Sequence, residues 1–382
     1  MYERLVDRSP RLTADDLAAR FVPPPRFADV SFASFVPNSD HPSQAAALAE
    51  LEAFAGELTP AAGSKPARAA GGGLFRRRPV LPPTAPDRAR PPRRQEQGQQ
   101  PTGRYLDGGF GVGKTHLLAS VWHAASGPKS FLTFEELTAF IGFVGMDTAI
   151  RSFSGHRVIC IDEFELDDVA NTRMAVTFLR AVVARGTHVV ATSNAVPDRL
   201  GEGRFNAAEF TRELQSIASH FEMVRIDGPD FRALANPVDA AMLSPGEVEA
   251  FAKRSHGRAT AVPASTPTPA PTATTTLDDF RDLLAHRRSV HPVHYGALID
   301  GVDSVVLTAV EPIESQDAAL LFVQLLDEVY DAGIRFAATG CQVGDLFPVG
   351  YRRGAYRKKY GRCESRLGAL LAEARAATSP LT

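Results

Sequence analysis

Short apolar runs that end in polar residues recur through the middle of the chain and predict strands of a parallel sheet. A short strand candidate lies at 103–107, four consecutive apolar residues lie at 158–161, and a further apolar run at 187–194 ends in polar side chains. Strands buried on both faces have continuous apolar runs of this kind. Helical runs separate them at 116–125 and 172–185, so the pattern predicts a three-layer α/β unit.

Two low-complexity segments interrupt this pattern. Residues 59–100 are rich in Pro, Ala and Gly, and from Lys65 to Glu96 they carry nine bases against two acids, a net charge of +7 in a chain of net charge −2. Residues 258–276 alternate Pro with Thr and Ala. Such compositions bury too little apolar surface to offset the entropy of ordering, so both are predicted to be disordered linkers. The basic one also suits a tether for nucleic acid or an anionic membrane.

The linkers predict five parts in the chain. These are an N-terminal strap and helix (1–58), the basic linker (59–100), an α/β core (101–257), the second linker (258–276) and a C-terminal α/β block that ends in a basic helix (277–382).

Composition excludes several classes of protein. The chain has 382 residues, of which 44% are hydrophobic and 23% charged, as in globular proteins. No apolar run approaches the ~18 residues of a membrane span, and no apolar stretch follows a basic N-terminus, so we expect a cytoplasmic protein that is not an integral membrane protein. Cys160, Cys341 and Cys363 form no CxxC pair, which argues against a disulfide framework or a structural zinc site.

A glycine-rich loop after the first core strand is the most informative motif. The loop comprises Gly108, Gly109, Phe110, Gly111, Val112, Gly113, Lys114 and Thr115, and a helical run follows. Strand, G-x-x-x-x-G-K-T and helix in this order predict a phosphate loop, in which glycines let successive N–H groups point at phosphate oxygens. We therefore expect ATP and Mg²⁺ as ligands, with Lys114 on the β- and γ-phosphates and Thr115 on the metal.

Two carboxylates follow the next core strand, at the end where ligands bind in open α/β sheets. Asp162 suits a ligand of Mg²⁺, and Glu163 suits polarisation of the attacking water. An alternative is a helix N-cap pair, because acids favour helix starts. Glu165, Asp167 and Asp168 lie closer to the next helix and can supply that cap, which leaves Asp162 and Glu163 for chemistry.

Asn194 ends the third core strand. At the tip of a strand beside Asp162, its amide can hold the nucleophilic water or sense the γ-phosphate. Taken alone, an asparagine at a strand end is also a common turn residue.

The phosphate loop, residues 160–164 and residues 191–194, in this order, resemble an AAA+ ATPase. More narrowly, the chain is similar to the ZapE family of cell-division ATPases, whose mitochondrial relatives are linked to inner-membrane protein turnover. The stretches that carry this likeness are 221–228 with 230–232, 325–331 and 365–367, and it covers about 101–257 and 277–382, and more loosely 20–58.

The resemblance implies an AAA+-like P-loop fold and Mg²⁺-dependent ATP hydrolysis that drives a conformational change. It also implies partners in the cell-division ring or among membrane-associated proteins, and a nucleotide-dependent homo-oligomer. An arginine finger belongs to that picture, because the family has a Gly-Leu-Gln-Arg block soon after the sensor asparagine. Here residues 200–205 read Leu-Gly-Glu-Gly-Arg-Phe, so Arg204 and Arg212 are the candidates, and each is equally compatible with a surface position.

Basic residues crowd the stretch from 352 to 366. On a helix, Lys359, Arg362 and Arg366 share one face, because they follow a spacing of three and four. Three interpretations fit: a patch for nucleic acid or a partner, a solvated basic helix, or a second sensor arginine that folds over the nucleotide phosphates. The resemblance favours the sensor, and Arg366, with Arg362 as the alternative, is then a nucleotide-binding residue.

Two further features are hypotheses from the pattern. Residues 37–44 precede the phosphate loop and suit one wall of an adenine pocket, or a strap packed onto the core. Residues 158–200 and 305–347 also match at a uniform offset of 147, which predicts a second, catalytically silent strand–helix–strand unit. In that comparison Asp162 and Glu163 correspond to Ala309 and Val310.

A nucleotide-gated DNA-binding or helicase-loader-like module is the alternative function, because Gly-Lys-Thr-His-Leu also occurs in replication initiators and loaders. Glu163 and Asn194 favour turnover over mere binding, and the sequence has no clear helix-turn-helix after the core. Nucleic acid stays among the possible ligands at this stage.

Overall fold

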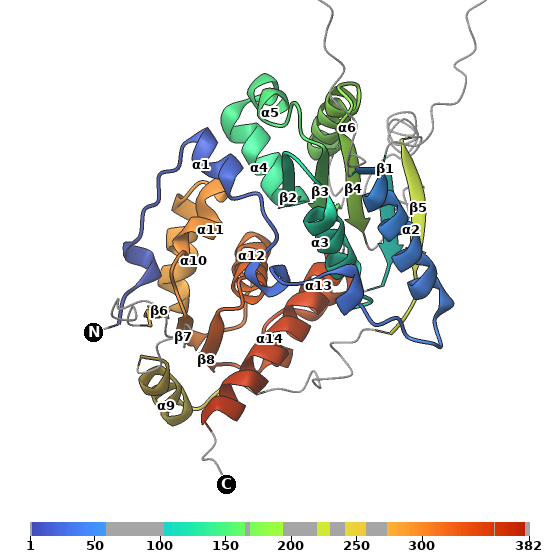
Figure 1. The fold of residues 1–382 in the computed structure, drawn as a ribbon. Coiled ribbons are helices and arrows are strands. Elements are labelled where there is room, and N and C mark those ends of the chain that lie inside the picture. The colour runs from blue at the N-terminus through green and yellow to red at the C-terminus, as the bar shows by residue number, and fades with distance from the viewer. Residues whose placement is uncertain are drawn as a thin grey trace, which may run out of the picture.

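Two parallel sheets, each covered by helices, organise the chain (Figure 1). The computed structural model describes residues 2–58, 103–109, 111–164, 169–193, 220–229, 241–256, 273–354 and 356–378. The larger sheet has five strands in the order β2-β3-β4-β1-β5, and the smaller has three in the order β6-β7-β8.

The five-stranded sheet is the middle layer of a three-layer unit, as the apolar pattern predicts. Its strands are β1 (Gly103–Gly108), β2 (Lys129–Thr133), β3 (Val158–Asp162), β4 (His188–Ser193) and β5 (Phe221–Ile226). Neighbouring residues of a strand enter different cores, because side chains alternate across a sheet. Leu106 packs in the core with two helices, whereas Tyr105 packs on the opposite face with three.

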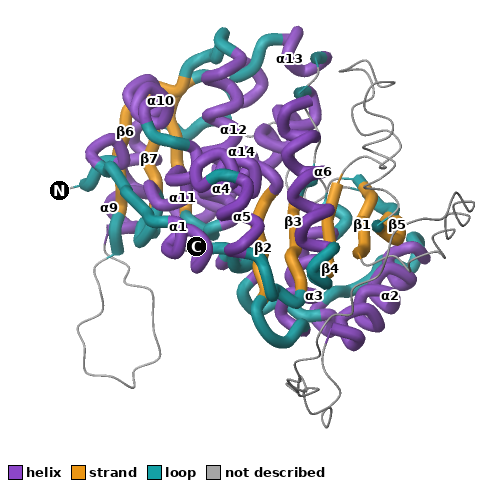
Figure 2. The backbone as a smooth tube through the Cα atoms, turned by 90° about the horizontal axis from the view of Figure 1, so that it is seen from above, coloured by secondary structure: helices purple, strands orange, loops and turns teal. Residues whose placement is uncertain are grey.

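Figure 2 shows the five strands side by side with helices on both faces. The core around Leu106 includes residues of α2 (Pro42–Leu58) and α3 (Lys114–Ala124). The core around Tyr105 includes residues of α4 (Phe134–Val144), α5 (Met146–Ser152) and α6 (Val169–Val183).

The three-stranded sheet has its own core. Its strands are β6 (Thr275–Asp279), β7 (Ser304–Val310) and β8 (Arg335–Gly340). The helices around it are α9 (Pro245–His256), α10 (Phe280–Ser289), α11 (Tyr295–Leu298), α12 (Gln316–Asp331), α13 (Val349–Arg353) and α14 (Arg357–Thr378). We call this assembly the C-terminal unit.

The C-terminal unit begins earlier in the chain than its composition indicates. β6 starts at Thr275, inside the segment expected to be a linker, because its threonines are buried between β7 and the N-terminal residues. Helix α9 lies within the expected first block, yet Val248 and Phe251 of α9 pack in the core of the second sheet.

The N-terminal segment contacts both sheets. Leu5 is buried in the core of the C-terminal unit, and its backbone N–H donates to Asp278 over 3.0 Å. Helix α1 (Ala14–Ala19) follows, and Phe21 packs in the core around Tyr105. The segment then crosses to α2, which packs on the opposite face of the larger sheet from Phe21 (Figure 1).

The strand–helix–strand units β3-α6-β4 and β7-α12-β8 share topology and backbone detail. In both, the two strands are parallel neighbours. The Thr192 hydroxyl of β4 accepts a hydrogen bond from the backbone N–H of Glu163, which follows β3. The Thr339 hydroxyl of β8 likewise accepts one from the backbone N–H of Ala309, near the end of β7. Val158 lies opposite His188 and Ser304 opposite Arg335, so the offset is 146 for the first strand and 147 for the second. Pairing Glu163 with Val310 is wrong by one residue, because the connection between the two strands is one residue longer in the second unit.

Candidate nucleotide-binding site

The glycine-rich loop joins the central strand β1 to helix α3. Gly111 and Gly113 have φ of 67° and 94°, in the left-handed region that favours glycine. Lys114 begins α3 and is 9% exposed; its Nζ donates to the carbonyl oxygens of Gly108 (2.8 Å) and Gly109 (2.5 Å). The ammonium group therefore lies against the loop, which is the position expected of a lysine that binds phosphate oxygens.

Thr115 and Asp162 face each other across the site. The Thr115 hydroxyl donates to Oδ2 of Asp162 over 3.0 Å, which joins the start of α3 to the end of β3. The two residues expected to hold Mg²⁺ are thus neighbours in space, and both groups offer hard oxygen ligands.

Thr192 supports this carboxylate, and the motif analysis did not single it out. Its buried hydroxyl donates to Oδ1 of Asp162 and accepts the backbone N–H of Glu163 over 3.0 Å. The Phe164 N–H donates to the Thr192 carbonyl over 2.7 Å. A signal was present in the sequence, because a hydroxyl side chain near the end of a strand beside β3 can reach that carboxylate.

Glu163 has an unusual backbone and a crowded carboxylate. Its φ is 53°, a conformation uncommon outside glycine. Its Oε2 lies 2.9 Å from Nη1 of Arg362, and its Oε1 lies 3.6 Å from Nη2 of Arg366. Burial raises the pKa of Glu163 to about 8, an effect that Arg362 and Arg366 oppose and that nearby carboxylates, Asp327 first, reinforce.

The N-terminal segment lies beside the phosphate loop and contacts the residues that follow β5; its predicted place at an adenine stays a prediction. A Cβ atom on Gly113 would come within 2.4 Å of the Phe35 ring. The Gln44 amide donates to the carbonyl of Asp227, just after β5, over 2.9 Å. The Ser43 hydroxyl accepts the Asp227 N–H, also over 2.9 Å.

The basic face of α14 points at carboxylates of both units. Lys359 pairs with Glu135 of α4 at 2.5 Å, and Arg362 and Arg366 each pair with Asp327 of α12 at 2.7 Å. The predicted shared face is therefore present. The two arginine side chains are only 5% and 8% exposed, so they are not part of a solvated helix or an open patch for nucleic acid. Arg366, expected on the nucleotide phosphates, contacts carboxylates in this structure.

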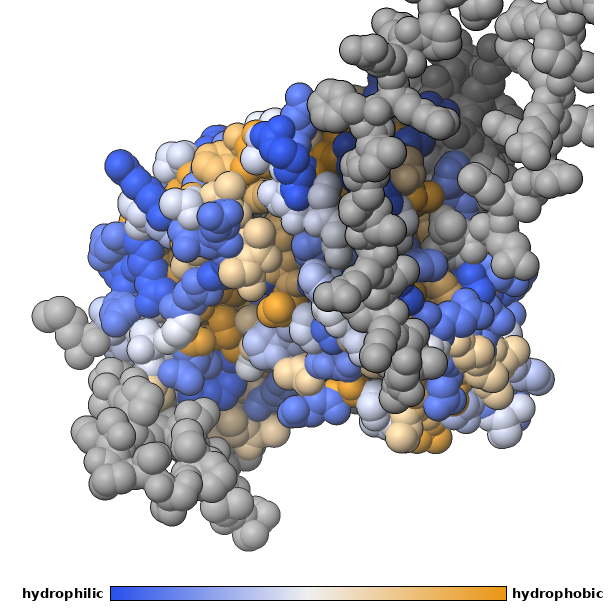
Figure 3. Space-filling model, turned by 45° about the horizontal axis from the view of Figure 1, so that its top comes forward, coloured by the Kyte–Doolittle hydropathy of each residue, from blue (hydrophilic) through white to orange (hydrophobic). Residues whose placement is uncertain are grey.

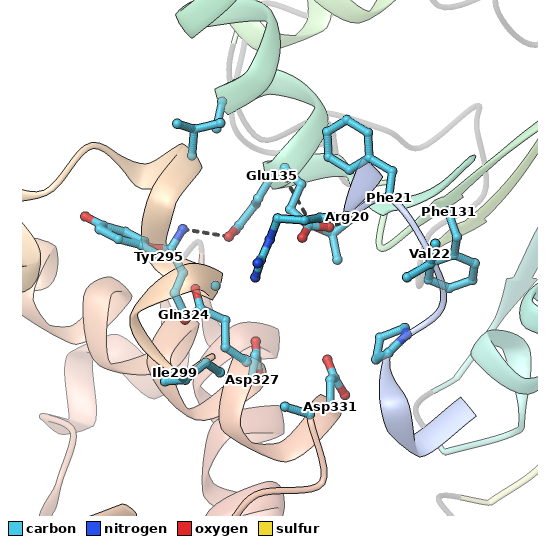
Figure 4. Close-up of a pocket in the computed structure, with 18 of the residues that line it drawn as sticks. Arg20, Phe21, Val22, Phe131, Glu135, Tyr295, Ile299, Gln324, Asp327 and Asp331 are labelled. Atoms are coloured by element: carbon cyan, nitrogen blue, oxygen red, sulfur yellow. Dashed lines mark hydrogen bonds between the residues drawn. The ribbon is translucent and has the colours of Figure 1, made fainter. Parts of the chain in front are cut away.

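A cavity of about 670 Å³ lies at the junction of the larger sheet and the C-terminal unit and is lined by residues of both. Figure 4 shows Arg20 extending into it from the N-terminal segment, with Glu135 on one side and Gln324, Asp327 and Asp331 of α12 on the other. Glu163 also lines this cavity. The carboxylate expected to polarise water thus faces the junction between the two units.

Four predicted site residues lie outside the described residues. They are Phe110 of the phosphate loop, Asn194, and the two arginine-finger candidates Arg204 and Arg212. Their proposed roles stay predictions. The predicted linker 59–100 and most of the predicted linker 258–276 also lie outside the described residues.

These features define the class of the protein. Strand β1 of the parallel sheet leads through a G-x-x-x-x-G-K-T loop into a helix, and Asp162 at the end of β3 in the same sheet contacts the loop threonine. This arrangement is that of a P-loop nucleotide-binding protein. The sequence model of the AFG1-like ATPase family matches residues 14–378, and the chain belongs to this family. It is a P-loop ATPase by family, which confirms the resemblance to ZapE-type proteins.

Curated relatives agree with this assignment. The chain is 27% identical over 298 residues to cell division protein ZapE of Escherichia coli (strain K12), covering 71% of this chain and 78% of the relative. ZapE of Escherichia coli O157:H7 matches to the same extent.

Solved structures give weaker likenesses. The DnaI crystal structure has a TM-score of 0.37 and 17% identity, covering 56% of this chain and 98% of that one. Domain III of the Thermotoga maritima replication initiation protein DnaA has a TM-score of 0.36 and 14% identity, covering 53% and 69%.

The surface mixes hydrophilic and hydrophobic residues on the face shown in Figure 3. Large apolar side chains that are exposed, such as Val36 and Val349, lie far apart in the sequence. Within the described ranges, no helix is long and apolar enough to cross a membrane.

Proposed function

We propose that this protein hydrolyses ATP to ADP and phosphate with Mg²⁺ and that hydrolysis drives a conformational change. One observation carries the proposal: the Thr115 hydroxyl and the Asp162 carboxylate meet at 3.0 Å beside Lys114, and Glu163 follows Asp162 directly. Lysine, hydroxyl, metal-ligating carboxylate and water-polarising carboxylate are the parts that phosphoryl transfer to water needs.

The residues of the site fit both ligands. Thr115 and Asp162 would hold Mg²⁺, which when bound neutralises charge on the phosphates. Gly111 and Gly113 hold the loop in a left-handed curve that places backbone N–H groups toward an anion, and Lys114 adds a positive charge at the same place. Glu163 would orient the attacking water and accept its proton.

The test separates binding from turnover. We would measure ATP affinity and phosphate release, with and without Mg²⁺, for wild type, Lys114→Ala and Glu163→Gln. Lys114→Ala is expected to lose ATP affinity, and Glu163→Gln to bind ATP normally while turnover falls at least about 100-fold. Lys253→Ala and Glu249→Gln, which change an exposed ion pair of α9, are matched controls expected to behave as wild type. Turnover that survives in Glu163→Gln would overturn the proposed role of that residue.

The proposed function also includes assembly into a homo-oligomer and action on a client protein. Arg204 or Arg212 would reach the nucleotide of a neighbouring copy in a nucleotide-dependent homo-oligomer, as the family resemblance implies. Mixing Lys114→Ala with Arg204→Ala protein tests this, because shared sites would restore turnover that neither variant has alone. The relatives are named cell division proteins, which supports a client in the division ring; a client at the membrane rests on the family resemblance alone. Co-sedimentation of ATP-bound Glu163→Gln protein with division-ring filaments tests that client.

A further inference from the structure

Glu163, Arg362, Asp327 and Arg366 form a ring of ion pairs, which we call the ion-pair cluster. Glu163 contacts both arginines, at 2.9 Å and 3.6 Å. Asp327 faces the same arginines from the other side, with Oδ2 2.7 Å from Nη2 of Arg362 and Oδ1 2.7 Å from Nη1 of Arg366. Each guanidinium therefore uses one terminal nitrogen for each carboxylate.

The ion-pair cluster joins two parts of the molecule. Glu163 follows β3 of the larger sheet, whereas Asp327 lies on α12 and both arginines lie on α14 of the C-terminal unit. Asp331 adds a contact of 3.2 Å to Arg366. The C-terminal unit therefore fixes its own guanidinium groups through α12, independently of Glu163.

We propose that Arg362 and Arg366, fixed by Asp327, are positioning residues that hold the Glu163 carboxylate for water activation, so that the C-terminal unit completes the hydrolytic site. This inference rests on the proposed ATPase function. It assigns to α12 and α14 a part in turnover, although neither belongs to the sheet that carries the phosphate loop.

Charge and geometry explain why Glu163 needs such support. Its carboxylate lies near Asp162 and Asp327, both of which disfavour its charged form. Arg362, 2.9 Å from one oxygen, and Arg366, 3.6 Å from the other, offset this repulsion and restrain the rotation of the carboxylate from both sides, which a single contact does not. The two guanidiniums lie between the carboxylates, so opposite charges alternate around the cluster.

The cluster also explains why lysine is a poor substitute. An arginine presents two terminal nitrogens in a rigid fork and bridges Glu163 and Asp327 at once, whereas a lysine offers one charged nitrogen on a flexible stem. Arg362→Lys and Arg366→Lys keep the positive charge but cannot bridge the two carboxylates. They therefore change the position of the Glu163 carboxylate with little change in the local charge.

The experiment measures kcat, KM and ATP affinity for Arg362→Lys and Arg366→Lys, each alone and combined with Glu163→Gln. Active protein is counted by the stoichiometry of ATP binding, so a partly unfolded preparation does not lower kcat. We expect kcat to fall about 10- to 100-fold in each lysine variant, with ATP affinity unchanged within about twofold. In the Glu163→Gln background the lysine substitutions should have no further effect, because they act through the carboxylate that is already gone.

Lys359→Arg is the matched control, since it also keeps the charge. Lys359 lies on the same face of α14 but pairs with Glu135, so the kcat of this variant should stay within about twofold of wild type. Effects that multiply with Glu163→Gln, or a loss of ATP affinity, would show that the arginines contact phosphate or serve only the fold, and would overturn this inference alone. Absence of turnover in wild type would overturn the proposed ATPase function and this inference together.

Discussion

Glu163 and Ala309 occupy equivalent positions in the two strand–helix–strand units, with φ of 53° and 57°. Each donates its backbone N–H to a threonine hydroxyl of the neighbouring strand, Thr192 at 3.0 Å and Thr339 at 3.3 Å. The same backbone geometry therefore occurs twice, and only the copy in the larger sheet carries a carboxylate. The C-terminal unit reproduces the backbone framework of the strand end that we propose to be catalytic, without its carboxylate.

Replacing Ala309 with glycine should stabilise the protein. A left-handed φ costs about 1–2 kcal/mol for a residue with a Cβ, and the methyl group of Ala309 is exposed and packs against little. Glycine also raises the conformational entropy of the unfolded chain, which offsets part of the benefit, so Ala309→Gly should raise the free energy of unfolding by about 0.5–1 kcal/mol. Denaturant unfolding measures the change. Gly333→Ala, which places a Cβ at φ 67° between α12 and β8, is the opposite control and should lose about 1 kcal/mol. Destabilisation by Ala309→Gly would show that the backbone there is not strained.

The features that the sequence predicts are local ones. Residues 108–115 and the pair Asp162 and Glu163 can be recognised because strand, loop and helix follow one another within a few residues. β6 is hidden by its composition, since Pro and Thr usually indicate a spacer, and only burial against β7 makes it a strand.

The ion-pair cluster could be predicted only in part. The spacing of Arg362 and Arg366 indicates a shared helix face, but the sequence gives no sign that this face meets Glu163 and Asp327. Those contacts depend on how the C-terminal unit docks on the larger sheet. Charge alone left nucleotide phosphate, nucleic acid, a partner protein and water as possible neighbours of the same arginines.

Gly113→Ala should weaken ATP binding more than it weakens the fold. The glycine has φ 94°, and a Cβ would come within 2.4 Å of the Phe35 ring, so the loop or the ring must move. We expect ATP affinity to fall at least about tenfold, measured by equilibrium titration. Gly142→Ala, on α4 with open space around it, should leave ATP affinity unchanged. An unchanged affinity in Gly113→Ala would mean that the loop tolerates this movement.

Thr192→Val removes a hydroxyl that makes two bonds and keeps the shape of the side chain. The Asp162 carboxylate and the Glu163 N–H each lose a partner, which should cost about 1–3 kcal/mol of stability and lower kcat. Thr177→Val, whose hydroxyl bonds the Arg173 carbonyl on the exposed face of α6, should change neither quantity. Stability and turnover are measured on the same preparations. A Thr192→Val protein with normal kcat would contradict a supporting role for Thr192 in the site.

The buried pair of Arg287 and Glu328 should behave differently from the exposed pair of Arg281 and Glu311. Arg287 is fully buried and pairs at 3.0 Å, so Arg287→Met leaves an unmatched carboxylate and should cost about 3–5 kcal/mol of unfolding free energy. Changing both partners, as Arg287→Met with Glu328→Leu, should recover most of this loss. Arg281→Met should leave the denaturation midpoint unchanged. Equal losses in the single and double variants of the buried pair would show that packing, not charge, determines the cost.

The pKa of Asp331 predicts how stability depends on pH. Burial raises this pKa from 3.8 to about 6, with the Asp327 and Asp162 carboxylates adding to the rise and Arg366 opposing it. Between about pH 4 and 6 the folded protein therefore holds a proton that the unfolded chain releases, so stability falls as pH rises through this range, by about 3 kcal/mol at most. Asp331→Asn cannot titrate, so its stability relative to wild type should increase from about pH 4 to about pH 7 and then level off. Urea unfolding at several pH values measures this, with Glu314→Gln, at an exposed position, as the control that should follow wild type. A difference between Asp331→Asn and wild type that stays constant with pH would show that folding does not raise the pKa of Asp331.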